Sequence, residues 1–110
     1  METLMSDTAK ARALNDKFRR TLTGGRVVVT RGVMALPNFP EILRQVQEFS
    51  AFDPGNDPYG EHDFGAFKVG EHQLFWKVDY YDPDLQMGSS DPADEAATAR
   101  VLTIMLASEY

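Results

Sequence analysis

The segment from residue 64 to residue 81 places the strongest constraint on the fold of this 110-residue chain. Two runs rich in aromatic residues, Phe64–Val69 and Gln73–Tyr81, are separated only by the three residues Gly70-Glu71-His72. Aromatic and β-branched residues favour strands, and a short connection that contains glycine is typical of a β-hairpin. The segment therefore predicts a hairpin and, with it, an antiparallel sheet.

Before the hairpin, the sequence predicts a helix and a strand. Apolar residues recur every three or four positions between Asp7 and Leu22, which is the spacing of one face of a helix. The residues of this face are Ala11, Leu14, Phe18 and Leu22. Ser6 or Asp7 can cap the start, and the glycine pair at 24–25 ends the helix, because glycine tolerates the left-handed backbone of a helix end. The β-branched run Arg26–Arg31 then predicts a strand, which extends at most to Ala35.

A second helix and a long loop are expected between this strand and the hairpin. Asn38 stands in the N-cap position, and Glu41 lies three residues later in the position of a capping box. The buried face of this helix is predicted to hold Ile42, Leu43, Val46 and Phe49. Two glycines and two prolines between residues 53 and 60 indicate that Phe52–Glu61 is a loop.

The last element is predicted as a third helix, Ala96–Ser108. A polar loop, Asp82–Ser90, comes first, and residues 91–95 supply a cap, a proline and acids suited to a helix start. A strand at 101–106 is the rival interpretation, because three of these six residues are β-branched. The predicted fold is α+β, with a small, mainly antiparallel three-stranded sheet packed with three helices in the order α-β-α-β-β-α. Residues 1–110 are expected to form a single domain, with 1–6 as a flexible tail.

Charge is distributed unevenly along the chain. The whole sequence has 11 basic and 17 acidic residues, for a net charge of −6. Residues 1–50 have a net charge of +3, whereas residues 51–110 have a net charge of −9. An acidic chain of this kind argues against direct binding to nucleic acid, which needs a basic surface. Either the two halves neutralise each other where they pack, or the acidic half attracts a basic partner.

Composition excludes several further classes of protein. The chain has no cysteine, so it has neither a disulfide framework nor a thiolate nucleophile or metal ligand. No apolar run of 18 residues is present, and residues 1–10 lack the apolar core of a signal peptide. We therefore expect a cytoplasmic protein that does not enter a membrane. No phosphate-binding loop or dinucleotide fingerprint is found, and no cofactor or metal is expected.

The segment from Asn56 to Gly65 is the richest in chemically active side chains. It places Asp57, Glu61, His62 and Asp63 within seven residues on a loop stiffened by proline and glycine. Four interpretations remain open. The group can bind a metal, act as a general acid–base site around the histidine, recognise an arginine-rich partner with Tyr59 as an aromatic anchor, or simply hold the loop in shape.

Two other groups have both a functional and a structural interpretation. Basic residues on the first helix can contact phosphate, although such residues more often form a solvated face. They are Arg12, Lys17, Arg19 and Arg20. Aromatic residues of the hairpin resemble a base-stacking surface, but nearby aspartates would repel a phosphate backbone. These aromatics, which are Phe64, Phe67, Trp76, Tyr80 and Tyr81, are predicted to serve mainly as core and cross-strand pairs.

Several segments together resemble a known family. The resemblance rests on GGRVVVTRG at 24–32, NDPYGEHDFG at 56–65, FWKVDYYD at 75–82, DPAD at 91–94 and RVLTIMLASEY at 100–110. With these segments the chain is similar to the bacterial domain-of-unknown-function family 3768, from about Leu14 onward. The family has no established activity, so the resemblance implies no catalytic residue. Its members tend to occur beside mobile-element genes, including anti-restriction genes, which implies interference with host defence.

Two functions of different classes follow. The first is a non-enzymatic inhibitor of the anti-CRISPR or anti-restriction type, whose acidic half binds a basic nucleic-acid-binding surface of another protein. Its candidate partner-binding residues are Asp53, Asp57, Tyr59, Glu61, Asp63, Asp79, Asp82, Asp84, Asp91, Asp94 and Glu95. The alternative is a small hydrolase or metal-dependent enzyme that uses Asp57, Glu61, His62 and Asp63. The chain is expected to be a monomer, or a homodimer in which the basic helix meets the acidic half of its twin.

Overall fold

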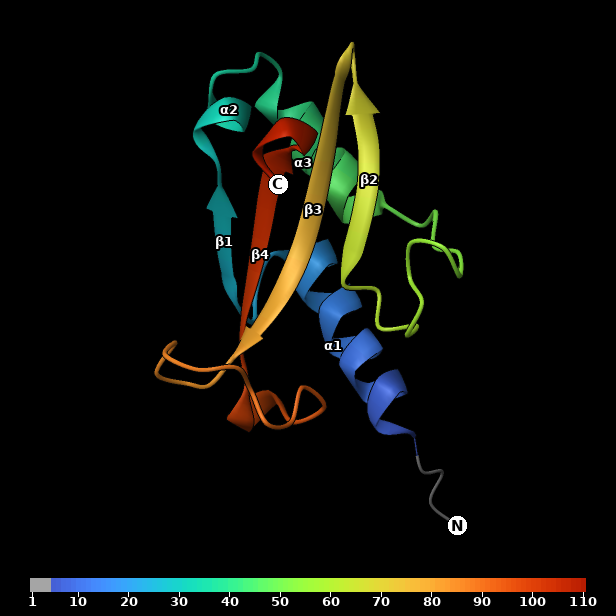
Figure 1. The fold of residues 1–110 in the computed structure, drawn as a ribbon, viewed down its shortest axis with the longest axis vertical. Coiled ribbons are helices and arrows are strands. Elements are labelled where there is room, and N and C mark those ends of the chain that lie inside the picture. Colours follow the sequence, from blue (N-terminus) through green and yellow to red (C-terminus); the bar gives the residue numbers. More distant parts are fainter. Residues whose placement is uncertain (1–4) are drawn as a thin grey trace.

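The computed structural model describes residues 5–110 of the chain (Figure 1). In chain order its elements are α1 (Asp7–Thr21), β1 (Arg26–Val29), α2 (Arg31–Met34), α3 (Phe39–Glu48), β2 (Phe64–Val69), β3 (His72–Tyr81), η1 (Glu95–Ala97), β4 (Ala99–Leu106) and η2 (Ala107–Glu109). The two η elements are single turns of 3₁₀ helix. Of the predicted tail, residues 1–4 lie outside the described residues, and Ser6 caps α1 by accepting a 3.1 Å hydrogen bond from the amide of Ala9.

The four strands form one mixed sheet in the order β1-β4-β3-β2. β2 and β3 make the predicted hairpin, with Phe64 opposite Lys77 and Val69 opposite His72. β4 pairs antiparallel with β3 and parallel with β1. The α+β class is therefore confirmed, but the prediction of a three-stranded sheet was wrong by one strand.

The additional strand is β4, which occupies most of the segment predicted as the third helix. The rival interpretation, a strand at 101–106, was correct. β4 lies between β1 and β3, so both of its edges are paired. From Ala99 to Ile104 the buried residues Arg100, Leu102 and Ile104 alternate with half-buried ones, which is the period of a strand, and Met105 is buried as well. In place of the helix predicted to start at residues 91–95, the structure has only the single turn η1, whose cap is Asp94.

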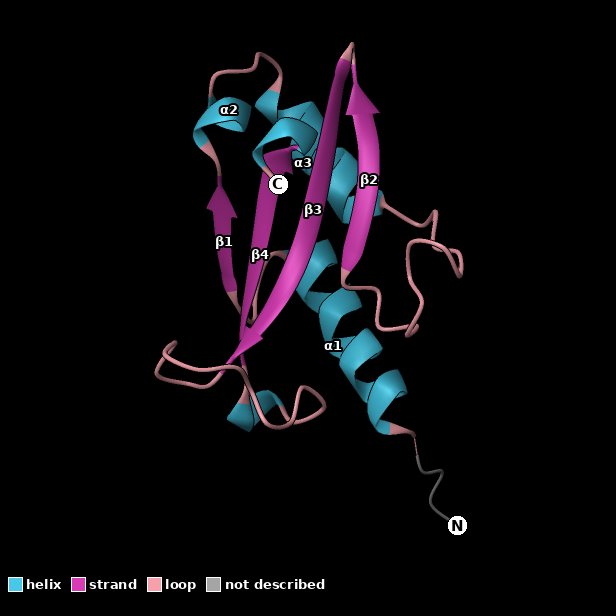
Figure 2. Ribbon diagram, viewed as in Figure 1, coloured by secondary structure: helices cyan, strands magenta, loops and turns pink. Residues whose placement is uncertain are grey.

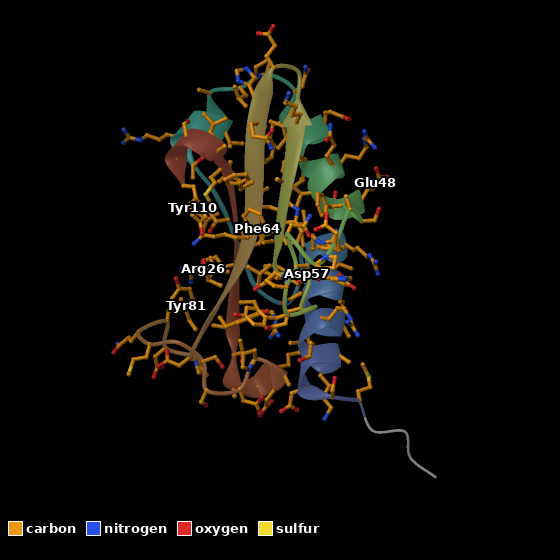
Figure 3. The ribbon with its side chains drawn as sticks, turned by 45° about the vertical axis from the view of Figure 1, so that its right-hand side comes forward. Arg26, Glu48, Asp57, Phe64, Tyr81 and Tyr110 are labelled. Atoms are coloured by element: carbon orange, nitrogen blue, oxygen red, sulfur yellow. The ribbon has the colours of Figure 1, made fainter. Side chains whose placement is uncertain are left out.

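Helices α1 and α3 cover one face of the sheet, as Figure 2 shows. The core between these helices and the sheet has one fully buried tryptophan and a set of aliphatic and phenylalanine side chains. It consists of Phe18, Val33, Ile42, Val46, Phe67, Leu74, Trp76, Val78, Leu102 and Ile104. On the opposite face, Phe64 and Phe75 contact Tyr110 with ring centroids 6.5 and 5.7 Å apart (Figure 3).

Both predicted helices in the first half are present, but several details differ. The buried residues of α1 are Ala11, Asn15, Phe18 and Arg19. Of the predicted stripe, Ala11 and Phe18 are buried, Leu22 is half-buried and packs against the core, and Leu14 is half-buried. Arg19 belongs to the core side of the helix and not to a solvated basic face.

The start of α3 does not use the predicted capping box. Asn38 has a left-handed backbone (φ 62°), and its side chain makes no capping hydrogen bond. Glu41 is bonded to Arg44 and Gln45 instead, because these side chains lie one turn further along the helix.

The first predicted strand was too long. β1 ends at Val29, and residues 31–34 form α2 in place of the extension toward Ala35. This turn of helix brings Val33 into the core, where it is fully buried.

Candidate functional site

The loop between α3 and β2 is tied to α1 by His62. The imidazole ring stacks on Phe52 with centroids 3.7 Å apart and an interplanar angle of 2°. Its Nδ1 lies 2.9 Å from Asp16 Oδ1, and its Nε2 lies 3.6 Å from Asp57 Oδ2. Asp57 Oδ1 also accepts a 3.2 Å bond from the backbone amide of His62. Both ring nitrogens therefore face carboxylates of the protein itself, and the histidine holds the loop against the helix.

Glu61 is also engaged by the protein, whereas Asp63 is only partly buried. Glu61 Oε1 accepts a 2.9 Å hydrogen bond from the hydroxyl of Tyr80. Asp63 is half-buried, and burial, followed by repulsion from Glu61, raises its pKa. The structure thus brings the predicted acid–base residues close together, but the side chains of Asp57, Glu61 and His62 are bonded to other groups of the protein. The two carboxylates beside His62 lie on opposite edges of its ring, and no three acidic or histidine residues within residues 5–110 are placed to hold a metal ion.

A buried polar network under this loop was missed by the sequence reasoning. Asn15 Nδ2 donates to the hydroxyl oxygen of Tyr80 at 2.7 Å and to the carbonyl of Glu61 at 3.0 Å. Its Oδ1 accepts from Arg100 Nε at 2.8 Å. Burial raises the pKa of the Tyr80 hydroxyl and lowers that of the Arg100 guanidinium. The network joins α1, β3, β4 and the loop at one point.

Arg19 is a second buried polar residue of α1, and it bonds to the end of α3. Its Nη1 donates to the carbonyl oxygens of Val46 at 3.0 Å and Phe49 at 2.9 Å, at the end of α3. Its Nη2 pairs with Asp16 at 3.1 Å, and burial lowers the pKa of its guanidinium. The one sequence signal for this role is that Asn15 and Arg19 lie four residues apart, on the helix face that also holds Ala11.

The connection between β3 and β4, residues 82–98, is the most acidic segment, and we call it the acidic connection. It contains five acids and no lysine or arginine. They are Asp82, Asp84, Asp91, Asp94 and Glu95. The ion pairs found within residues 5–110 involve none of these five. Four of them are exposed and Asp82 is half-buried.

The acidic connection has a defined local structure. Asp82, Asp91 and Asp94 each use Oδ1 to accept a backbone amide of their own turn, at 2.9 to 3.2 Å. The hydroxyls of Ser89 and Thr98 lie 2.7 Å apart and join its middle to its C-terminal end. The bonds to backbone amides hold the carboxylates of Asp82, Asp91 and Asp94 in place.

An apolar group lies among these carboxylates. Met87 is 71% exposed and Leu85 is 37% exposed. A methionine this exposed is unusual on a solvated surface, because long apolar side chains are more often buried. The combination of an apolar centre and a charged rim is typical of protein-binding surfaces.

The remaining partner-binding candidates lie elsewhere. Asp57 is only 9% exposed and lies against α1 (Figure 3), whereas Tyr59 is 77% exposed. Asp53 accepts the amides of two residues in its own turn. Asp79 pairs with Lys77 at 2.7 Å. The eleven predicted residues therefore do not form one continuous surface.

The acidic connection and the loop before β2 meet at the first turns of α1. A groove of about 220 Å³ lies there, lined by Asp7, Glu61 and Asp91 together with small neighbours. No lysine or arginine lines this groove. It extends the negative surface of the acidic connection toward the loop before β2.

A family model matches residues 29–109, and it is described as Protein of unknown function (DUF3768). The chain belongs to this family. The earlier resemblance is thereby confirmed, and the matched residues of this DUF3768 chain include the whole acidic connection but not α1. No curated protein and no solved structure matches the chain. Among residues 5–110, no helix combines the length and the apolar character needed to cross a bilayer.

The basic and acidic halves of this DUF3768 chain do not neutralise each other through direct ion pairs. Arg19 pairs with Asp16, Arg44 with Glu41 and Glu48, and Lys77 with Asp79, so each pair stays within its own half. Among the charge pairs within residues 5–110, only that of His62 with Asp16 joins the two halves. The negative charge of the acidic connection is thus directed to solvent.

Proposed function

We propose that the chain is a non-enzymatic binding protein whose acidic connection engages a basic, nucleic-acid-binding surface of another protein. One observation carries this proposal. Five carboxylates and no base lie on a folded loop, and none of the five makes an ion pair among the described residues. Bound in this way, the loop would occupy the positions that nucleic-acid phosphates take on the partner.

The physical basis is electrostatic steering followed by local packing. Fixed carboxylates attract a basic surface over about 8 Å at physiological ionic strength and raise the association rate. Met87 and Leu85 then supply apolar area at the centre of the contact, where binding energy concentrates. The groove lined by Asp7, Glu61 and Asp91 gives a second anchoring point for an arginine or lysine side chain.

The partner class follows from the charge. Proteins that grip nucleic acid present lysine and arginine to phosphates, so bacterial restriction and CRISPR effectors are suitable first partners to test. In such a pair the chain would act as an inhibitor, because its acidic connection and the nucleic acid would compete for the same basic surface.

The test is a pair of charge-neutralising variants with a matched control. The variant Asp84→Asn with Asp94→Asn removes two charges from the acidic connection, and asparagine retains the Oδ1 acceptor that Asp94 uses. The control Glu48→Gln with Glu71→Gln removes two exposed charges elsewhere. Affinity for purified effectors is measured by calorimetry at about 50 and about 300 mM salt, which brackets the screening of surface charge.

We expect the first variant to bind roughly tenfold more weakly than the native chain, which corresponds to about 1.4 kcal/mol, and the control to remain within about twofold. Native binding should weaken at the higher salt concentration, and nucleic acid should displace the chain. An affinity that changes neither with salt concentration nor with neutralisation of the two aspartates would refute the proposal.

A further inference from the structure

Arg100 is a buried cation that makes no ion pair within residues 5–110, and Glu95 and Glu61 attract its guanidinium only from beyond 4.0 Å. Arg100 is only 3% exposed, and no carboxylate within residues 5–110 lies within 4.0 Å of its guanidinium. Nε donates to Asn15, Nη2 donates to the carbonyl of Pro92, and the group lies 5.3 Å from the centroid of the Tyr80 ring. Nη1 makes no hydrogen bond to the described part of the chain. Buried charges in proteins are normally paired, so Arg100 has unused capacity to bind an anion.

A cavity of about 210 Å³ opens beside this side chain, between the end of α1, the turn that follows it and η1. Leu14 and Phe18 give it apolar walls, and Gly24 lies at the turn. Lys17 and Glu95 also line it, and both are exposed residues. The volume restricts any ligand to a small molecule.

The charges around the cavity select the ligand class. Arg100 and Lys17 offer two cations to a carboxylate, and charge-assisted hydrogen bonds of this kind are stronger than neutral ones. Glu95 offers a carboxylate to an ammonium group, and it would repel a doubly charged phosphate. The apolar walls suit a short hydrocarbon side chain. We propose that this cavity binds a small α-amino acid in its zwitterionic form.

The test uses the full-length protein and amide NMR spectra. Each of the common amino acids is titrated to about 10 mM, a range suited to ligands of this size. The best amino acid is then compared with the acid that lacks its amine and with the amine that lacks its carboxylate. We expect saturable shifts of the Gly24 and Gly25 amides with one or more amino acids, and at least tenfold weaker binding of both truncated compounds. Absence of saturable shifts, or equal binding of either truncated compound, would overturn the proposal.

Two variants test the cavity, and Lys17→Ala also separates it from the proposed partner surface, because Glu95 belongs to both. Lys17→Ala and Glu95→Gln alter exposed residues of the cavity rim, and each is expected to weaken amino-acid binding about tenfold. Lys10→Ala, on the same helix but outside the cavity lining, is the control and should bind like the native chain. Unchanged binding in Lys17→Ala contradicts the site. Lys17→Ala should leave partner binding intact, so failure of one proposal is distinguishable from failure of the other.

Discussion

Gly65 allows the largest side chain of the core to be buried completely. A Cβ atom at this position would lie 2.3 Å from Nε1 of Trp76 and 2.8 Å from the ring of Phe49. The rings of Phe49 and Phe52 meet Trp76 edge-on, with centroids 5.5 and 6.1 Å away. This arrangement leaves no room for even one methyl group beside the indole.

Replacing Gly65 by alanine should therefore destabilise the fold. We expect Gly65→Ala to lower the free energy of unfolding by about 1–3 kcal/mol, the usual cost of overpacking a core, as measured by urea denaturation. The control is Gly70→Asn in the hairpin turn, where φ is +61° and a Cβ atom would have no neighbour within 4 Å. Asparagine tolerates that backbone, so the control should lose less than about 1 kcal/mol. Equal losses would contradict the packing explanation.

Asp63 provides a pH-dependent test at a single residue. Its pKa is raised in the folded chain, first by burial and then by Glu61. A carboxyl group whose folded pKa is raised costs no stability while it is protonated in both states; the cost grows as the pH rises from the ordinary pKa to the raised one and is complete above it. Asp63→Asn should therefore raise Tm at pH 7 and have little effect near pH 3. Asp53→Asn, at an exposed position, is the control. The same gain at both pH values would exclude ionisation as the cause.

At the scale of elements, the sequence allowed correct prediction where the signal is local. The helix at 7–21 and the hairpin at 64–81 depend on periodicity and turn residues, and both are present. β4 was predicted as a helix, because the run at 101–106 is apolar on more than one side. That run arises because β4 is central: one face packs on α1 and α3, and its neighbours cover both edges. The residue pattern within one segment does not predict which strands become its neighbours in the sheet.

The turn η2 is attached to the start of α2 through Glu109. Its carboxylate accepts hydrogen bonds from Thr30 Oγ1 at 2.6 Å, from the Gly32 amide at 3.1 Å and from the Leu106 amide at 2.8 Å. These bonds lower the pKa of Glu109. The attachment is thus complete above the ordinary pKa of a glutamate and is lost as the pH falls through the lowered value.

Glu109→Ala should release this turn. We expect the amides of Gly32 and Leu106 to exchange with deuterium faster in the variant at pH 7, while the amides at the centre of β3 keep their protection. Ser108→Ala, also at an exposed position, should exchange like the native chain. Unaltered exchange at Gly32 would show that the carboxylate does not hold the turn.

At the scale of the whole molecule, Asn15 joins segments that are far apart in the chain. It bonds to Arg100, Tyr80 and Glu61, at sequence separations of 85, 65 and 46 residues. Such a network was not predictable, because a polar residue on a helix shows no sign of its distant partners. The acidic connection was predictable only in its first half: residues 82–90 were expected to be a loop, whereas residues 91–95, which hold three of its five acids, were expected to start a helix. Asp57 was predicted to bind a partner, which requires exposure. Its burial depends on the packing of α1 against the loop, so it was not predictable from the sequence.

Removing this amide should loosen the whole fold. Asn15→Ala leaves Arg100 Nε without its acceptor and Tyr80 without one of its partners, so the free energy of unfolding should fall by about 2–4 kcal/mol. Lys10→Ala, on the exposed side of the same helix, should change it by less than about 0.5 kcal/mol. Chemical denaturation of both variants measures the difference, and similar values would show that the network contributes little.

The position of β4 also has a consequence for biosynthesis. β1 leaves the ribosome early, but its neighbour in the sheet spans residues 99–106, so about seventy residues must be translated before the two can pair. Until then β1 and the hairpin have no strand between them, and the nascent polypeptide exposes the apolar surfaces that β4 later covers. Chaperones that recognise such surfaces would have their longest opportunity to bind during that interval.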